Sequence, residues 1–242
     1  MTPDHADHAD HADHPDRADY ADRADPPVGP PGGVPVPPMR PTLTREYLAA
    51  AALALVDAHG LRKFSMRKLG TAVGFDPMAV YRHYADQEDL FDGVAEALFA
   101  ELDVATLPWD GPWQRLARDY CLRLRDTLLR HPHAVPLFAT RPVRSPASID
   151  TGVRMLAKLR DAGLPPADGL RAFRCLREFT VGHALAVTVA DLGGAERSRK
   201  PEPDDAAYNL LAEAADATTS GDHFEAGLAA LLHGFERLAA SP

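Results

Sequence analysis

The chain has 242 residues, of which 45% are hydrophobic, so it is long enough to bury a substantial core. No stretch approaches the ~20 consecutive apolar residues that a membrane span requires, and the first residues lack the basic and then apolar pattern of a secretion signal. Two cysteines, Cys121 and Cys175, lie far apart within apolar helical patterns, which excludes a disulfide framework and indicates two buried thiols. We therefore expect a cytoplasmic protein with no membrane partner.

The charge is distributed unevenly along the chain. The formal net charge is -9, and residues 1–39 contribute eight Asp against two Arg. Residues 40–85 have the opposite balance, with seven Lys or Arg against three Asp or Glu. A short basic segment in an otherwise acidic chain is typical of a nucleic-acid-binding head attached to a body that does not bind nucleic acid.

The N-terminal segment is predicted to be a disordered arm over residues 1–41. Residues 1–25 repeat a triplet rich in Asp, His and Ala, and residues 26–41 are dominated by Pro and Gly, so neither part can bury enough apolar surface to offset the entropy of ordering. Regularly spaced histidines leave open a metal-responsive or metal-storing protein, although the same repeat can be solvated and without a role: His5, His8, His11 and His14. We predict no defined metal site and no cofactor.

The head, defined as residues 42–87, begins with two predicted helices. Thr44 is a suitable N-cap for the first helix, whose apolar stripe ends before Gly60. The second helix is expected over about residues 65–73, with Ser65 as its N-cap, and a turn at Gly74 follows.

A third helix is predicted from Asp76 to about Tyr84. Asp76 can cap it, and Pro77 loses no hydrogen bond at the first helical position. A helix, a glycine turn and a second helix within about 20 residues form the helix-turn-helix arrangement, in which the second helix enters the major groove of DNA.

The remaining residues 88–242 are predicted to form a helical body that binds a ligand and dimerises. Asp86 is expected to cap a long fourth helix with an inward stripe of Leu90, Val94, Leu98 and Leu102. Residues 193–205 are typical of a loop. Further helices are expected at residues 113–130, 134–139, 148–162, 168–192, 208–217 and 224–240. No run alternates with period two, so the predicted fold class is all-α.

Residues 43–98 resemble the DNA-binding head of the TetR family of repressors. The resemblance depends on the glycine after the first helix, on the S-M-R-K-L-G-x-x-V-G pattern of the second helix and on the M-x-V-Y-R-H-Y pattern of the third. It implies that the following residues bind DNA: Thr44, Arg45, Ser65, Arg67, Pro77, Met78, Ala79, Tyr81, Arg82, His83, Tyr84 and Gln87. Tyr81 and Tyr84 have the alternative of being mainly core aromatics. Gln87 occupies the position where the family usually has a phosphate-binding Lys, so one charged contact is missing.

The body is similar to the C-terminal domain of the tetracycline repressor branch of this family. Residues 131–143 (HPHAVPLFATRPV) and 177–186 (REFTVGHALA) carry the similarity. Leu137 and Ala186 stand where that branch has a magnesium-binding His and an acidic residue, so tetracycline–magnesium is not the expected ligand. The resemblance implies an apolar pocket with these candidate ligand-binding residues: Leu137, Phe138, Thr140, Arg141, Phe179 and His183.

Two apolar stripes predict a dimer interface made of two helices from each subunit, as in the family. One stripe recurs with coiled-coil spacing in the last helix and the other lies on the preceding long helix. The alternative is that both stripes face the subunit's own core. The predicted interface residues are Phe173, Leu176, Thr180, Phe224, Leu228, Leu231 and Phe235.

These features predict a homodimeric transcriptional repressor that binds double-stranded operator DNA and is released by a small-molecule effector. A helical enzyme is the first alternative, but no G-x-S-x-G, H-E-x-x-H, P-loop or G-x-G-x-x-G motif is present, and we predict no catalytic residues. His131 and His133 near Arg141 and Arg144 could bind a phosphate or carboxylate, but no nucleophile is paired with them. An activator, or a regulator without a ligand, stays open.

Overall fold

The computed structural model describes residues 42–188, 213 and 219–239, and within these ranges it contains helices and no strand. This agrees with the predicted all-α class. The elements are α1 (Arg45–His59), η1 (Leu61–Lys63), α2 (Met66–Ala72), α3 (Pro77–Val80), α4 (Gln87–Ala100), η2 (Val104–Thr106), α5 (Trp113–Arg130), η3 (Pro132–Ala134), α6 (Val135–Thr140), α7 (Pro146–Asp161), α8 (Pro166–Val187) and α10 (Ser220–Ala239).

The first two helices of the head form where their caps were expected. The Thr44 hydroxyl accepts a hydrogen bond from the Tyr47 amide at 3.1 Å, and the Ser65 hydroxyl accepts one from the Lys68 amide at 3.3 Å. Each bond satisfies an amide that the first helical turn leaves without a backbone partner. Gly60 ends α1 with a φ of 77°, a left-handed value that favours glycine. Local chemistry therefore accounts for the bounds of α1 and α2.

The third helix is shorter than predicted. Regular α-helix covers only Pro77–Val80, and the chain continues to Tyr84 in tighter turns. The Arg82 amide donates to the Ala79 carbonyl at 3.3 Å, and the His83 amide donates to the Val80 carbonyl at 3.0 Å. These are three-residue spacings, which tighten the end of a helix. Backbone hydrogen bonds therefore continue the helical turns from Asp76 to Tyr84.

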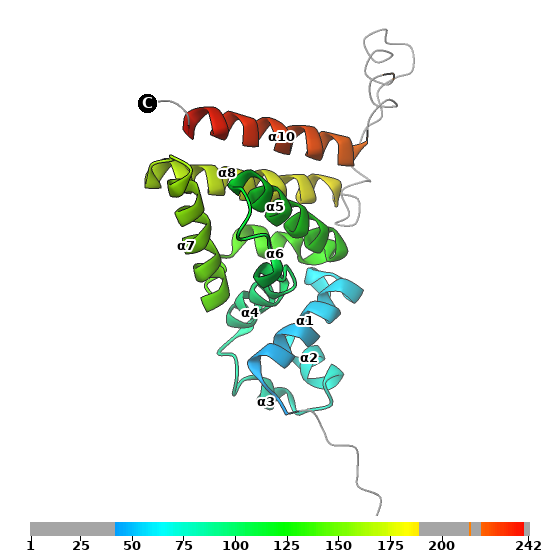
Figure 1. Cartoon of the computed structure of the whole chain (residues 1–242). Helices are drawn as coiled ribbons and strands as arrows, with labels where there is room; N and C mark the ends of the chain where they lie inside the picture. Colours follow the sequence, from blue (N-terminus) through cyan, green and yellow to red (C-terminus); the bar gives the residue numbers. More distant parts are fainter. Residues whose placement is uncertain (1–41, 189–212, 214–218, 240–242) are drawn as a thin grey trace, which may run out of the picture. The chain divides into compact units, whose positions relative to one another are not determined.

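Helix α4 packs against both the head and the body. It contacts α1 on one side and contacts α5 and α6 on the other. Its predicted inward stripe is buried, since Leu90, Val94 and Leu98 are fully covered and Leu102 is 2% exposed. In Figure 1, α4 lies beside α1 and below α6. A displacement of α4 would therefore also move α1, because the two helices pack together.

The body helices fall close to their predicted positions. Helix α5 has the predicted bounds, whereas α7 and α10 begin earlier than expected because Pro146 and Ser220 already take helical positions. Helix α8 is described as far as Val187. The predictions for residues 1–41, 193–205 and most of 208–217 lie outside the described residues. None of the helices in the described ranges has both the length and the hydropathy that crossing a bilayer demands.

The prediction of two buried thiols is wrong for one cysteine. Cys121 on α5 is buried, and burial raises the pKa of its thiol to about 11. Cys175 on α8 is exposed. The reason is that α8 buries only one face, which carries Ala172, Leu176 and Thr180, and Cys175 lies on the other.

The predicted dimer interface is also wrong for four of its residues. Leu176, Thr180, Phe224 and Leu228 are each at most 1% exposed within a single chain, so they cannot contact a second copy. Their stripes face the chain's own core because α10 packs on α8 and α5 (Figure 1). The remaining predicted members are partly buried against the same core: Phe173, Leu231 and Phe235.

Candidate functional site

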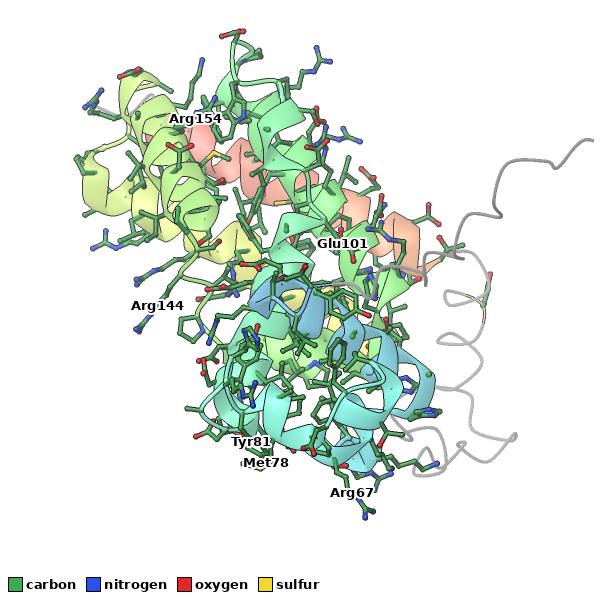
Figure 2. The ribbon with its side chains drawn as sticks, turned by 90° about the horizontal axis from the view of Figure 1, so that it is seen from below. Arg67, Met78, Tyr81, Glu101, Arg144 and Arg154 are labelled. Carbon is green, nitrogen blue, oxygen red and sulfur yellow. The ribbon has the colours of Figure 1, made fainter. Side chains whose placement is uncertain are left out.

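The segment that follows Asp76 presents side chains to solvent on one face. The Asp76 carboxylate accepts a hydrogen bond from the Met78 amide at 2.7 Å, which fixes the start of α3. Val80 is fully buried, whereas Met78 is 66% exposed and Tyr81 is 45% exposed. In Figure 2, Met78 and Tyr81 project from the same edge of the head as Arg67 of α2. Among the described residues, this face is therefore exposed to solvent.

The head also carries unpaired positive charge. Five cationic side chains of η1, α2 and the end of α3 are exposed: Arg62, Lys63, Arg67, Lys68 and Arg82. Within the described ranges none of them lies within 4.0 Å of a carboxylate, and Lys68 instead donates to the Lys63 carbonyl at 2.6 Å. Several arginines of the body are paired, for example Arg118 with Glu225 at 2.7 Å. The charges of the head are therefore available to phosphate groups.

Helices α2 and α3 approach each other closely at Gly70. A Cβ atom at this buried position would lie 2.8 Å from the Cα of Pro77 and 3.0 Å from its nitrogen. Both neighbours are backbone atoms, which cannot rotate away. Glycine is therefore required where residues 77–84, which we call the reading segment, pack on α2.

A cavity of about 380 Å³ lies in the body, within the size range of small-molecule sites. Helices α4, α5, α6, α7 and α8 and the α6–α7 connection all contribute to its wall. The lining residues are Phe99, Tyr120, Phe138, Ala139, Thr140, Arg141, Pro142, Val143, Ser148, Thr151, Phe173 and Arg177.

Arg141 links this cavity to α4. Its guanidinium pairs with the Glu88 carboxylate and, at 2.5 Å, with the Asp92 carboxylate, both on α4. It also donates to the Glu88 carbonyl at 3.0 Å and lies 5.6 Å from the centre of the Phe91 ring. The Nε atom of Arg141 is buried and lacks a hydrogen-bond partner within the described residues. One side chain thus touches both the cavity and the helix that packs on the head.

Two family models match these two regions of the chain. The model described as bacterial regulatory proteins, tetR family, matches residues 48–94. The model described as tetracyclin repressor-like, C-terminal domain, matches residues 107–239, which is more than half of the chain. The chain belongs to the TetR family of transcriptional regulators. It is a DNA-binding regulator. The match to the first model ends inside α4, at residue 94, so the predicted domain boundary at residue 87 stays a prediction.

The most similar proteins include named TetR-family repressors. The tetracycline repressor protein class D of Escherichia coli is 30% identical over 199 residues, which cover 80% of this chain and 89% of that repressor. An HTH-type transcriptional regulator of Saccharopolyspora erythraea is 32% identical over 152 residues, but the match spans only 63% of that relative. The solved structure of ActR from Streptomyces coelicolor with actinorhodin has a TM-score of 0.68 and 25% identity, over 83% of this chain and 100% of that chain. The names describe regulators, not enzymes.

Most of the residues that the TetR resemblance assigned to DNA binding lie at the surface of the head. The exposed ones are Thr44, Arg45, Arg67, Met78, Tyr81 and Arg82. The partly buried ones are Ser65, Pro77, Ala79, His83 and Gln87. Their contacts with DNA stay predictions. Arg62, Lys63 and Lys68 were missed, although the charge count of residues 40–85 already included them.

Tyr84 is the exception, and its assignment to DNA binding is corrected. It is 2% exposed, and its hydroxyl donates to the Arg45 carbonyl at 2.8 Å. Its ring fits over Gly93 of α4, where a Cβ would lie 2.4 Å from the hydroxyl oxygen. The Arg45 guanidinium lies 4.0 Å from the ring centre and pairs with Asp89 at 2.7 Å. Burial raises the pKa of Tyr84 to about 12, so this side chain joins the head to α4 as a neutral phenol.

Three of the six predicted ligand-binding residues line the cavity: Phe138, Thr140 and Arg141. The other three do not. Leu137 is buried in the core on another side of α6. Phe179 and His183 pack on Phe224, at 5.3 Å and 4.8 Å between ring centres, because α10 covers that face of α8. Their assignment to the cavity is corrected.

Sequence reasoning missed the cavity residues contributed by α4, α5 and α7 and by the middle of α8. Phe99, Tyr120, Thr151 and Arg177 lie on different helices, and no spacing in the chain relates them. Phe173 was assigned to the dimer interface but lines the cavity. The available signals were the resemblance of residues 131–143, which marked one wall, and that of residues 177–186, which begins with Arg177.

A second hollow, of about 820 Å³, lies between α1, α4 and the start of α7. Alanines line much of it, and their short side chains leave the space open: Ala49, Ala50, Ala54, Ala97, Ala100 and Ala147. Asp57, Glu101 and His131 lie at the same hollow. Polar contacts among these three side chains therefore join α1 and α4 to the body where apolar packing is thin.

Replacing Arg67 or Arg82 with alanine is expected to weaken operator binding. Each loss should be about 1–3 kcal/mol where the side chain contacts a base, because a bidentate guanidinium contact is removed. Fluorescence anisotropy with a labelled operator fragment measures the change. Arg160→Ala is the matched control, since Arg160 is exposed on α7 and pairs with its neighbour Asp161 at 3.0 Å. Unchanged affinity in both head variants would remove these residues from the reading surface.

Proposed function

We propose that this chain is a homodimeric repressor that leaves its operator when a small molecule fills the cavity between α4 and α8. The relatives support this, since tetracycline repressors are among them and ActR has been solved in complex with actinorhodin. The chain is expected to act in the cytoplasm and to have no catalytic activity.

Two recognition segments are needed to read an operator. A two-fold dimer spaces them about 34 Å apart, which matches successive major grooves of a pseudo-palindromic site. The four fully buried residues of the stripes cannot reach a second copy, so the interface is placed on the outward faces of α8 and α10. Positions on these faces are open, because a Cβ on Gly182 or Gly234 would meet no atom within 4 Å.

The observation that carries the proposal is the pairing of Arg141 with Glu88 and Asp92. Arg141 lines the cavity, and the two carboxylates lie in the first half of α4, directly after the reading segment. A ligand that engages Arg141 competes with these carboxylates for its donors. Helix α4 then loses a contact that holds it against α6, and α1 moves with α4 because the two helices are packed together. By reciprocity, operator DNA weakens ligand binding by the same factor.

The test removes the two pairs without a ligand. The double variant Glu88→Gln with Asp92→Asn should mimic the ligand in part and weaken operator binding, within the about 5–150-fold range of allosteric coupling. Operator titrations followed by gel shift measure this. Asp150→Asn is the control, because Asp150 pairs with Arg154 at 3.7 Å on the surface of α7. Unchanged operator affinity in the double variant would contradict coupling through Arg141.

A further inference from the structure

We infer that the cavity takes a flat aromatic ligand that carries a carboxylate or a similar negative group, and that Arg177 binds this group. The inference rests on the proposed function only in using the same cavity. It specifies the chemical class of the effector from the residues of the wall.

Aromatic side chains form much of the wall. Phe99 of α4, Tyr120 of α5, Phe138 of α6 and Phe173 of α8 all line the cavity. The Tyr120 and Phe173 rings are 5.3 Å apart between centres and tilted by 53°. Rings that surround a space in this way make offset or edge-to-face contacts with another planar ring. A flat aromatic compound therefore matches the wall better than a globular or chain-like one does.

The charge of the wall has one sign. Two guanidinium groups, Arg141 and Arg177, are among the lining residues, and no Asp or Glu is. Arg141 is already paired with Glu88 and Asp92. A cationic ligand would find no counter-charge on this wall, and a neutral ligand would leave Arg177 without one.

Arg177 lacks an acidic partner. It is partly buried, and its one hydrogen bond is to the Phe138 carbonyl at 3.3 Å. Its guanidinium also lies 5.1 Å from the centre of the Phe138 ring. The part of the chain that the structure describes places no carboxylate within 4.0 Å of it. A guanidinium has five N–H donors, so most of them remain for a ligand oxygen, and a carboxylate is the partner that fits this fork.

Hydroxyl groups of the wall indicate where the ligand donates hydrogen bonds. Thr140, Ser148 and Thr151 donate their protons to backbone carbonyls, at 2.8 Å to Pro136, 3.0 Å to Val143 and 2.7 Å to Ala147. Each hydroxyl oxygen keeps acceptor capacity after donating its own proton. A phenolic hydroxyl on the ligand complements these oxygens. The expected effector is thus a hydroxylated aromatic acid.

The experiment compares matched probes on the full chain. Isothermal titration is performed with 3-hydroxy-2-naphthoate and anthraquinone-2-carboxylate, each against its own methyl ester. The dissociation constant of each acid should be lower than that of its ester by a factor of about ten or more, which is the factor expected for a charge-assisted hydrogen bond. Acids that bind no better than their esters, or no binding by either acid at about 1 mM, would overturn the inference.

Variants of α8 assign the anion to Arg177. Arg177→Met should remove the preference for acid over ester, and Arg177→Lys should restore part of it because the charge returns. Arg174→Met is the matched control, since Arg174 lies one turn earlier on α8, is exposed and does not line the cavity. Thermal melts identify any variant that fails to fold, and the ratio of acid to ester binding in Arg177→Lys then decides. An unchanged ratio in the Arg177 variants would overturn the assignment.

A gel-shift arm separates this inference from the proposed function. An acid that binds through Arg177 without releasing the operator supports the ligand class and contradicts release by the cavity. An operator that is released equally by acid and ester, in wild type and in Arg177→Met, supports release and overturns the ligand class.

Discussion

Replacing Gly70 with alanine is expected to abolish specific operator binding while the body stays folded. The new Cβ would lie 2.8 Å from the Pro77 Cα and 3.3 Å from the Phe75 carbonyl oxygen, so α3 must move away from α2. Overpacking of this kind costs about 1–3 kcal/mol, which outweighs the roughly 1 kcal/mol that alanine gains over glycine in a helix. Displacement of the reading segment should lower operator affinity by about a hundredfold or more, toward non-specific binding.

Gly152→Ala is the matched control for this substitution. Gly152 is also helical, in α7, but a Cβ at that position would meet no atom within 4 Å. This variant should gain about 0.5–1 kcal/mol of stability and bind the operator like wild type. Anisotropy titrations with operator and with scrambled duplex measure specific binding, and thermal melts report the fold. Wild-type specificity in Gly70→Ala would show that α3 does not need its close packing on α2.

Replacing His131 with phenylalanine is expected to loosen the joint between head and body and to remove a pH dependence of stability. His131 Nδ1 lies 2.7 Å from an Asp57 carboxylate oxygen of α1, and its Nε2 lies 3.0 Å from a Glu101 carboxylate oxygen that follows α4. Arg130 also pairs with Glu101 at 3.0 Å, and the His133 ring nitrogen bonds to the Asp57 carbonyl at 2.9 Å. Both ring nitrogens of His131 can donate together only when the imidazole is protonated.

The pKa of His131 gives the direction of the effect. Burial alone would lower this pKa, but the hydrogen bonds and charges of Asp57 and Glu101 outweigh burial and raise it above 6.5. A raised pKa in the folded state contributes stability below the unfolded value of about 6.5, and this stability is lost as pH rises through the folded value. Wild type should therefore become less stable as pH rises above about 6.5, whereas His131→Phe should lack this component.

Urea unfolding across this pH range tests the prediction. At low pH, His131→Phe should be less stable than wild type by about 1–2 kcal/mol, a range kept small because the carboxylates are partly exposed and screened. His233→Phe is the control, since His233 is 72% exposed and only approaches Glu236 at 3.8 Å. The role of this joint would be contradicted if the free energy of unfolding of wild type did not fall as the pH rises above 6.5, or if His131→Phe showed the same pH dependence as wild type.

Local chemistry along the sequence was sufficient to predict most of the helix bounds within the described residues and the exposed side chains at the start of α3, whereas their contacts with DNA stay predictions. The caps Thr44, Ser65 and Asp86 bind amides only three residues away, so their effect is visible in a short window. The exposed face around Met78 and Tyr81 follows in the same way from one capped turn. The TetR resemblance covered this region because its motifs are also contiguous.

The cavity and the subunit's own core were decided only by the tertiary structure. Periodicity predicts that Phe224 and Leu228 are buried, but it does not tell whether they pack on the same chain or on a second copy. Likewise, Arg177 and Arg141 look alike in the sequence, and only the approach of α4 pairs one of them with carboxylates and leaves the other to the cavity. The physical reason is that burial and ion pairing depend on which helices meet, and residues as distant in sequence as Phe99 and Arg177 have no local interaction that determines it.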